Sequence, residues 1–202
     1  YMYDLDKKVE SAVTNRPGDQ IRPCISGNKI IWVDKNSHYI YLTEIDNTGL
    51  MNRLGVFRSG KFYLDYNGSG TWDSADKTHT FGLATDTPVA GDWNKDGKTE
   101  IGVMRGNLWY LDYNGNGKWD SSLDKTYTFG LSTDQPISGD WNGDGKTEIG
   151  VFRNSVWALD YDGNGVWNKS IDKTYTFGMS GDKPITGDWN KDGKTEIGVM
   201  RG

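Results

Sequence analysis

The segment G-D-W-N-G-D-G-K-T-E-I-G-V-F-R, residues 139–153, spaces its polar side chains so that they could bind a metal ion. Asp140, Asn142 and Asp144 occupy every second position, Gly145 permits a sharp turn, and Glu148 follows at the ninth position. Side-chain oxygens at positions 1, 3, 5 and 9 can converge on one point with a backbone carbonyl at position 7. Because Ca²⁺ takes roughly six to eight hard oxygen ligands and Mg²⁺ usually draws fewer from protein, the spacing predicts a calcium site.

This loop pattern occurs three times, and we call these segments the first-series loops: residues 92–100, 140–148 and 188–196. The alternative is a turn without metal, since Asp, Asn and Gly favour turns by themselves. A plain turn does not need the acid kept at position 9, and an ion would relieve repulsion among the carboxylates, so the sequence favours calcium. The predicted ligands, with each lysine contributing its backbone carbonyl, are Asp92, Asn94, Asp96, Lys98, Glu100, Asp140, Asn142, Asp144, Lys146, Glu148, Asp188, Asn190, Asp192, Lys194 and Glu196.

A second series of loops keeps the same spacing with fewer charges, and an aspartate ends each of them: residues 65–76, 112–124 and 160–172. For these second-series loops the sequence leaves calcium and a bare Asx-rich turn equally open. It predicts uneven occupancy, because Ser69 stands at position 5 of one loop and Asn168 at position 9 of another. The weaker candidate ligands are Asp65, Asn67, Ser69, Asp73, Asp112, Asn114, Asn116, Asp120, Asp160, Asp162 and Asn164.

The loops must be held by short strands that repeat with them. The phrase G-V-(F/M)-R recurs from Gly55, Gly102, Gly150 and Gly198, at spacings of 47, 48 and 48 residues. Four strands in about 48 residues is the size of one β-propeller blade, whose apolar faces need neighbours. We therefore predict an all-β propeller of four-stranded antiparallel blades, with solenoid stacking as the alternative. Within one period the strand candidates are Pro136–Trp141, Glu148–Arg153, Ser155–Tyr161 and Lys173–Phe177.

The first fifty residues follow a different phrase with a similar rhythm. We predict divergent propeller-type blades in residues 1–50 and three regular repeats in residues 51–202, the last ending part-way through a blade. Because the chain opens on Tyr1 and stops inside a motif, we expect a fragment of a larger propeller. The strand candidates of the first part are Tyr1–Leu5, Val9–Val13, Arg22–Gly27, Lys29–Asp34 and Tyr39–Glu44.

The repeated tryptophans form two groups. Those between the ligands of the first-series loops must point away from an ion, so we predict that they pack between blades: Trp93, Trp141 and Trp189. Those at the far end of the second-series loops are interpreted either as packing over the loop or as half-exposed platforms for sugar rings: Trp72, Trp119 and Trp167.

Composition and charge exclude several classes of protein. The 27 glycines and 13% aromatic residues fit short strands and tight turns. No segment has a sustained apolar period of 3.6 residues, so we predict almost no helix. A net charge of −5 argues against a nucleic-acid or anionic-membrane partner, and no apolar run is long enough to span a membrane. No nucleophile elbow, phosphate-binding loop or His/Cys cluster is present, and the acids recur in every repeat, so we predict that the chain is not an enzyme.

These phrases, with V-W-A-L-D-Y-D-G-N-G-V-W and D-K-T-Y-T-F-G, resemble the FG-GAP/VCBS-type repeats of secreted and surface-displayed prokaryotic proteins. Such repeats are related to the calcium-binding propeller blades of integrin α chains, and the resemblance covers about residues 53–202. It implies a propeller with calcium at the first-series ligands. Residues 20–46 are similar to another propeller repeat of archaeal and bacterial surface proteins.

The resemblance implies an extracellular or cell-surface location in a prokaryote. We expect a calcium-stabilised module that recognises a protein or a glycan, with a role in adhesion. The alternative is an accessory or catalytic propeller of a secreted carbohydrate-active enzyme, whose active groups would lie in loops that do not repeat. A third possibility is a purely structural spacer in a surface layer.

Overall fold

The computed structural model describes residues 55–201 in full and, before them, only the backbone of five strands. All regular secondary structure in these residues is β-strand, which confirms the prediction of an all-β chain without helix. No described segment forms a helix of the length and apolarity that crossing a bilayer requires. The predicted division between residues 50 and 51 falls outside the described residues and stays a prediction.

The strands follow one another in antiparallel sheets, so each sheet is a meander. The first two strands form a separate pair, β1 (Met2–Asp4) and β2 (Val9–Ser11). A six-stranded sheet follows: β3 (Gln20–Ser26), β4 (Lys29–Asp34), β5 (Ile40–Glu44), β6 (Gly55–Arg58), β7 (Lys61–Leu64) and β8 (Lys77–Thr80). The next sheet has four strands: β9 (Thr87–Gly91), β10 (Glu100–Arg105), β11 (Leu108–Leu111) and β12 (Lys125–Thr128). So does its successor: β13 (Gln135–Gly139), β14 (Glu148–Arg153), β15 (Val156–Leu159) and β16 (Lys173–Thr176). The last pair is β17 (Lys183–Gly187) and β18 (Glu196–Met200).

The four strands predicted within one period are confirmed as β13 to β16, with ends that shift by at most two residues. The second strand of each four-stranded sheet is buried over its whole length up to a half-buried arginine. A strand with both faces buried needs a layer on each side of its sheet, which is why these strands are continuous runs of apolar residues and glycine.

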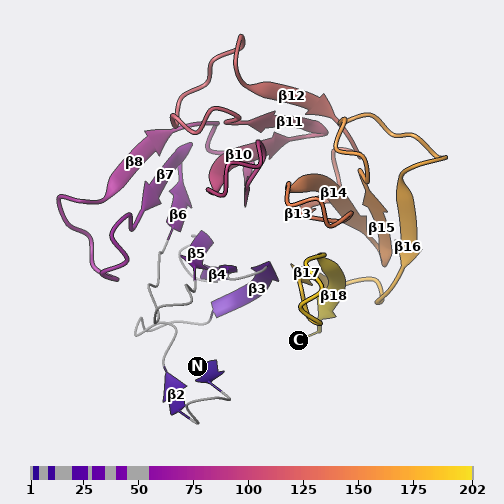
Figure 1. Cartoon of the computed structure of the whole chain (residues 1–202), viewed down its shortest axis with the longest axis horizontal. Coiled ribbons are helices and arrows are strands. Elements are labelled where there is room, and N and C mark those ends of the chain that lie inside the picture. The colour runs from indigo at the N-terminus through magenta and orange to yellow at the C-terminus, as the bar shows by residue number, and fades with distance from the viewer. Residues whose placement is uncertain are drawn as a thin grey trace.

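Figure 1 shows the sheets that follow the β1–β2 pair side by side around a common centre, with β13 and β17 near that centre and β8, β12 and β16 at the periphery. Strand β9 contacts β13, as β13 contacts β17. The core lies between successive sheets. Phe57, Phe62 and Phe81 of one sheet pack with Ile101 and Val103 of the next. The following interfaces are built in the same way. In addition, β17 lies beside β3, so the last strand pair neighbours the first part of the chain.

The predicted burial of tryptophans in the first-series loops is confirmed for two and wrong for the third. Trp93 and Trp141 are 1% and 3% exposed, and their indole N–H groups donate to Ile101 O and Ile149 O at 3.2 and 3.1 Å. Trp189 is 46% exposed. The reason is positional, because the sheet of Trp189 has two described strands, whereas Trp93 and Trp141 share their core clusters with Trp109 and Trp157 of a third strand.

Candidate metal centres

The meander brings the two series of loops to the same end of the strands in each sheet. In four antiparallel strands, the connection between the first and second strands and that between the third and fourth lie at the same end. First-series loops join β9 to β10 and β13 to β14, whereas second-series loops join β11 to β12 and β15 to β16. Each complete repeat therefore has one loop of each series at the same end of its strands.

The structure brings the acids of every first-series loop together. In each loop the carboxylates at positions 1, 5 and 9 offer ligand oxygens within 4.8 Å of one another: Asp92, Asp96 and Glu100; Asp140, Asp144 and Glu148; and Asp188, Asp192 and Glu196. The aspartate at position 1 also accepts the backbone N–H groups of positions 5 and 6, for example Asp144 N at 3.1 Å and Gly145 N at 2.7 Å on Asp140. These bonds fold the loop around its first carboxylate.

The glutamate at position 9 is a buried carboxylate. Glu148 is 2% exposed, its Oε2 accepts Trp141 N at 3.1 Å, and its Oε1 is buried without a hydrogen-bond donor. Burial, followed by the nearby charges of Asp144 and Asp140, raises the pKa of Glu148 to about 8. Burial likewise raises the pKa of Glu100 to about 7. A buried carboxylate oxygen with no donor is unfavourable unless a proton or a cation neutralises it.

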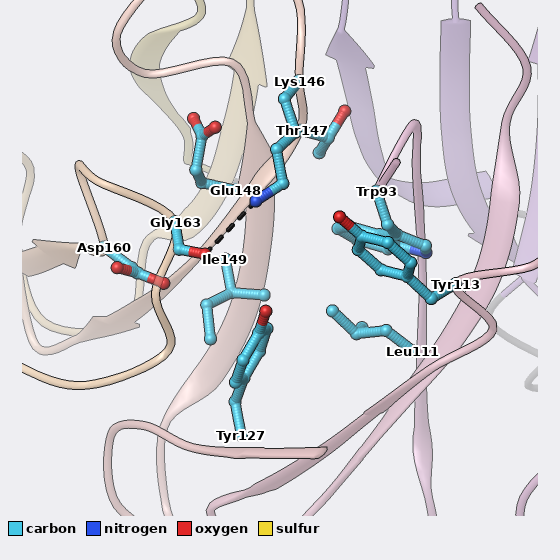
Figure 2. A pocket seen from close by; sticks show the side chains of 10 residues that line it. All are labelled: Trp93, Leu111, Tyr113, Tyr127, Lys146, Thr147, Glu148, Ile149, Asp160 and Gly163. Atoms are coloured by element: carbon cyan, nitrogen blue, oxygen red, sulfur yellow. Dashed lines mark hydrogen bonds between the residues drawn. The ribbon is translucent and has the colours of Figure 1, made fainter. Parts of the chain in front are cut away.

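The lysine at position 7 has different surroundings in the first two loops. Lys98 Nζ lies 3.0 Å from Asp96 Oδ2, so the first loop has its own counter-charge. Lys146 Nζ donates instead to the backbone oxygen of Gly163 at 3.2 Å, across to the second-series loop (Figure 2). Among the described residues, no ammonium group donates a hydrogen bond to the acids of loop 140–148. Whether the lysine carbonyls bind an ion stays a prediction.

The asparagine at position 3 ties the two loops of a repeat to each other. Asn94 Nδ2 donates to Tyr113 O at 2.9 Å, and Asn142 Nδ2 donates to Tyr161 O at 3.0 Å. An aspartate at this position would place a carboxylate against a carbonyl oxygen, which explains why an amide stands there. No second-series loop follows Asn190 in the described residues, and its Nδ2 donates to Asp192 and Glu196, both at 3.2 Å.

Glycines let the two loops approach closely. Gly163 has a φ of 66°, and a Cβ there would come within 3.0 Å of Glu148 Cγ. Figure 2 shows Glu148, Asp160 and Gly163 on one side of a small pocket, with Trp93 and Tyr113 on the other. The buried acids of both loops therefore share one region between two sheets.

Consecutive first-series loops are also bonded to each other through a threonine that the ligand pattern does not include. Thr147 Oγ1 accepts Asp92 N at 3.0 Å, and Thr147 N donates to Asp92 O at 2.8 Å. Thr195 makes the same pair of bonds with Asp140. The sequence signal for this contact is the threonine that recurs at position 8 of every first-series loop.

Each repeat also has an ion pair that the loop motifs do not indicate. The guanidinium of Arg105 donates through Nε and Nη2 to the two oxygens of Asp86, both at 2.8 Å, and the Asp86 side chain is 0% exposed. Arg201 binds Asp182 in the same way, and the third pair joins Arg153 and Asp134 at 3.1 Å. The sequence signal is an aspartate 19 residues before the arginine in the last three copies of the G-V-(F/M)-R phrase, whereas Arg58 of the first copy has Tyr39 at that distance.

The second-series loops differ from one repeat to the next. Asp160, Asp162 and Asp172 offer ligand oxygens within 4.8 Å of one another, and the sequence-based ligand set omits Asp172. Within the described chain, loops 65–76 and 112–124 do not bring three acids together in this way. Asp73 instead accepts Asn67 Nδ2 at 2.9 Å and is exposed.

The second-series tryptophans are partly packed and partly open, as both interpretations of them require. Trp72, Trp119 and Trp167 are 59%, 42% and 45% exposed. Trp119 packs edge-on against Phe81 of the preceding sheet and against Tyr110 of its own, at centroid distances of 6.1 and 5.3 Å. It also lines an open pocket with Arg105.

Comparisons with known proteins give one result. The search of curated proteins and that of solved structures find no match to the chain. The scan against family models matches residues 140–199, which run from the first ligand position of one first-series loop to strand β18 of the next repeat. The matched family is described as an FG-GAP-like repeat, so this part of the chain is similar to an FG-GAP-like repeat.

Proposed function

We propose that this chain is a calcium-stabilised extracellular propeller module that recognises a protein or a glycan at a prokaryotic cell surface. FG-GAP repeats form propellers, and the match at residues 140–199 agrees with sheets that stand side by side around a centre. We propose that such sheets form the ring of a propeller. The acids recur at equivalent positions of the repeats, which supports a structural role for them rather than catalysis.

The observation that carries the calcium proposal is the oxygen of Glu148 that is buried without a donor, beside Asp140 and Asp144. The three carboxylates, with the side-chain oxygen of Asn142, provide the hard donors that suit Ca²⁺. When bound, the ion would neutralise the acids. The chain itself holds the loop through the backbone N–H groups of positions 5 and 6, which donate to the carboxylate of Asp140.

Recognition of a glycan is supported by the pocket beside Trp119. It is lined by Phe81, Gly82, Val103, Arg105, Tyr110 and Trp119. A half-exposed indole next to a guanidinium offers a flat apolar face and hydrogen-bond donors, the combination that sugar rings require. If glycan binding uses this pocket, Trp119→Ala abolishes binding on a glycan array while far-UV circular dichroism stays unchanged.

Calorimetric titration of the chelator-treated chain tests the calcium proposal. We expect at least one calcium ion for each of the three first-series loops, and one ion fewer for Asp144→Ala. Ser138→Ala is a matched control, because this serine lies on the preceding strand and bonds Ala90 O rather than the loop. A titration without heat, together with a melting curve that ignores chelator, would show that these loops are metal-free turns.

A further inference from the structure

The loop 160–172 differs from the other second-series loops in the residue at position 3. Asn67 and Asn114 stand there in loops 65–76 and 112–124, whereas loop 160–172 has Asp162. Asp162 lies close to Asp160 and Asp172, so this loop alone among the second-series loops gathers three acids within 4.8 Å in the described chain.

The hydrogen bonds of the aspartate at position 1 differ as well. In the two other loops its Oδ1 accepts the N–H of position 5, from Ser69 to Asp65 at 3.0 Å and from Asn116 to Asp112 at 3.1 Å. In loop 160–172 this bond is missing. Asp160 keeps only the bond from Gly165 N to Oδ2 at 2.8 Å, and its Oδ1 has no donor.

The oxygen without a donor belongs to a completely buried side chain. Asp160 is 0% exposed. Among the residues that the structure describes, no lysine or arginine forms an ion pair with Asp160, Asp162 or Asp172. A buried carboxylate that has an unpaired oxygen and two further acids close to it is costly in a protein interior. A cation bound among the three acids would remove that cost.

We propose that loop 160–172 is a second kind of calcium site, with Asp160, Asp162 and Asp172 as its carboxylate ligands, and that loops 65–76 and 112–124 do not bind calcium. The donors are hard oxygens, which favour a divalent cation of the Ca²⁺ class over softer metals. The proposal does not rest on the first-series loops, because none of its ligands belongs to them.

The test compares the number of calcium ions bound by the full chain and by two isosteric variants. Asp162→Asn gives loop 160–172 the residue that the other two loops have at position 3. Asp120→Asn is the matched control, because it gives loop 112–124 the residue that Asn168 provides at position 9 of loop 160–172. Bound calcium is counted by equilibrium dialysis of chelator-treated protein, with free calcium raised to about 5 mM to include weak extracellular sites.

We expect Asp162→Asn to bind one calcium ion fewer than the parent chain and Asp120→Asn to bind the same number. Since Asp162 is exposed, the variant should keep the parent's circular dichroism in chelator. An unchanged count for Asp162→Asn would overturn the proposal and leave a proton shared by the acids as the explanation. The first-series proposal has a separate test. If it were wrong, its own variant, Asp144→Ala, would leave the number of bound calcium ions unchanged.

A second measurement needs no variant. Crystals of the parent chain grown with calcium should show an anomalous peak among the carboxylates of loop 160–172 and none in loop 112–124. An empty loop 160–172 beside filled first-series loops would refute this inference alone.

Discussion

Replacing Glu148 by glutamine should change the stability of the chain in opposite directions with and without calcium. The substitution keeps an oxygen that can accept the Trp141 amide and removes the buried negative charge. Without metal, that charge opposes folding. Because the pKa of Glu148 is raised from 4.5 to about 8, the penalty begins above pH 4.5 and grows until about pH 8.

The magnitude follows from the size of this shift. Each pKa unit is worth about 1.4 kcal/mol, so at about pH 7 the charge costs up to about 3 kcal/mol of folding free energy. The new amide NH2 takes the place of Oε1, which has no hydrogen-bond partner, and an NH2 left without one costs about 1 to 2 kcal/mol. In chelator the variant should therefore be about 1 kcal/mol more stable than the parent.

Calcium should reverse this order. A site filled at a hundred times its Kd stabilises the folded chain by about 2.7 kcal/mol, and the variant loses that contribution. With calcium the parent should then be the more stable protein, by about 1 to 2 kcal/mol. Urea unfolding in chelator and in calcium measures both differences.

Glu196→Gln is the matched control. Glu196 is half-buried and both of its oxygens accept hydrogen bonds, from Trp189 N at 2.8 Å and Asn190 Nδ2 at 3.2 Å. The Glu196→Gln variant should be less stable than the parent in calcium and no more stable than the parent in chelator. A Glu148→Gln variant that shifts the urea midpoint in the same direction under both conditions would refute the reasoning.

Three further predictions concern contacts that repeat along the chain. Thr147→Val should lower the unfolding free energy by about 1 kcal/mol in urea titrations, whereas Thr99→Val should not, because the buried Thr99 hydroxyl has no hydrogen-bond partner. Arg105→Ala should cost about 3 kcal/mol in the same titration, since it leaves a fully buried aspartate unpaired, and a loss below about 1 kcal/mol would contradict this. Phe129→Ala should cost about 3 kcal/mol and Phe177→Ala far less, since the two side chains are 3% and 51% exposed; equal melting temperatures for the two variants would speak against packing between successive sheets.

The last two described sheets show why a repeated sequence does not have repeated surroundings. Phe129 is covered by Trp167 of the next repeat, with ring centroids 6.0 Å apart. Phe177 has the same place in its own repeat, but no equivalent tryptophan follows it in the described residues. Trp189 is exposed in a sheet of which two strands are described. Local sequence predicts that such a side chain is apolar, whereas its burial depends on the neighbouring sheet.

The sequence by itself determined the strands, their period and the gathering of acids in the first-series loops. These features are local: apolar runs bounded by glycine and asparagine define the strands, and ligands within nine positions of one another come together in one turn.

Only the tertiary structure decided which acids are buried and which loops touch. Two hydrogen bonds join residues of different loops: Asn142 donates to Tyr161, and Asp92 donates to Thr147. The burial of the unpaired oxygens of Glu148 and Asp160 depends on adjacent sheets. Their positions follow from the stacking of one sheet on the next, which fixes contacts over 19 and 55 residues of sequence. No spacing within a single loop contains that information, because burial and long-range pairing belong to the packed chain.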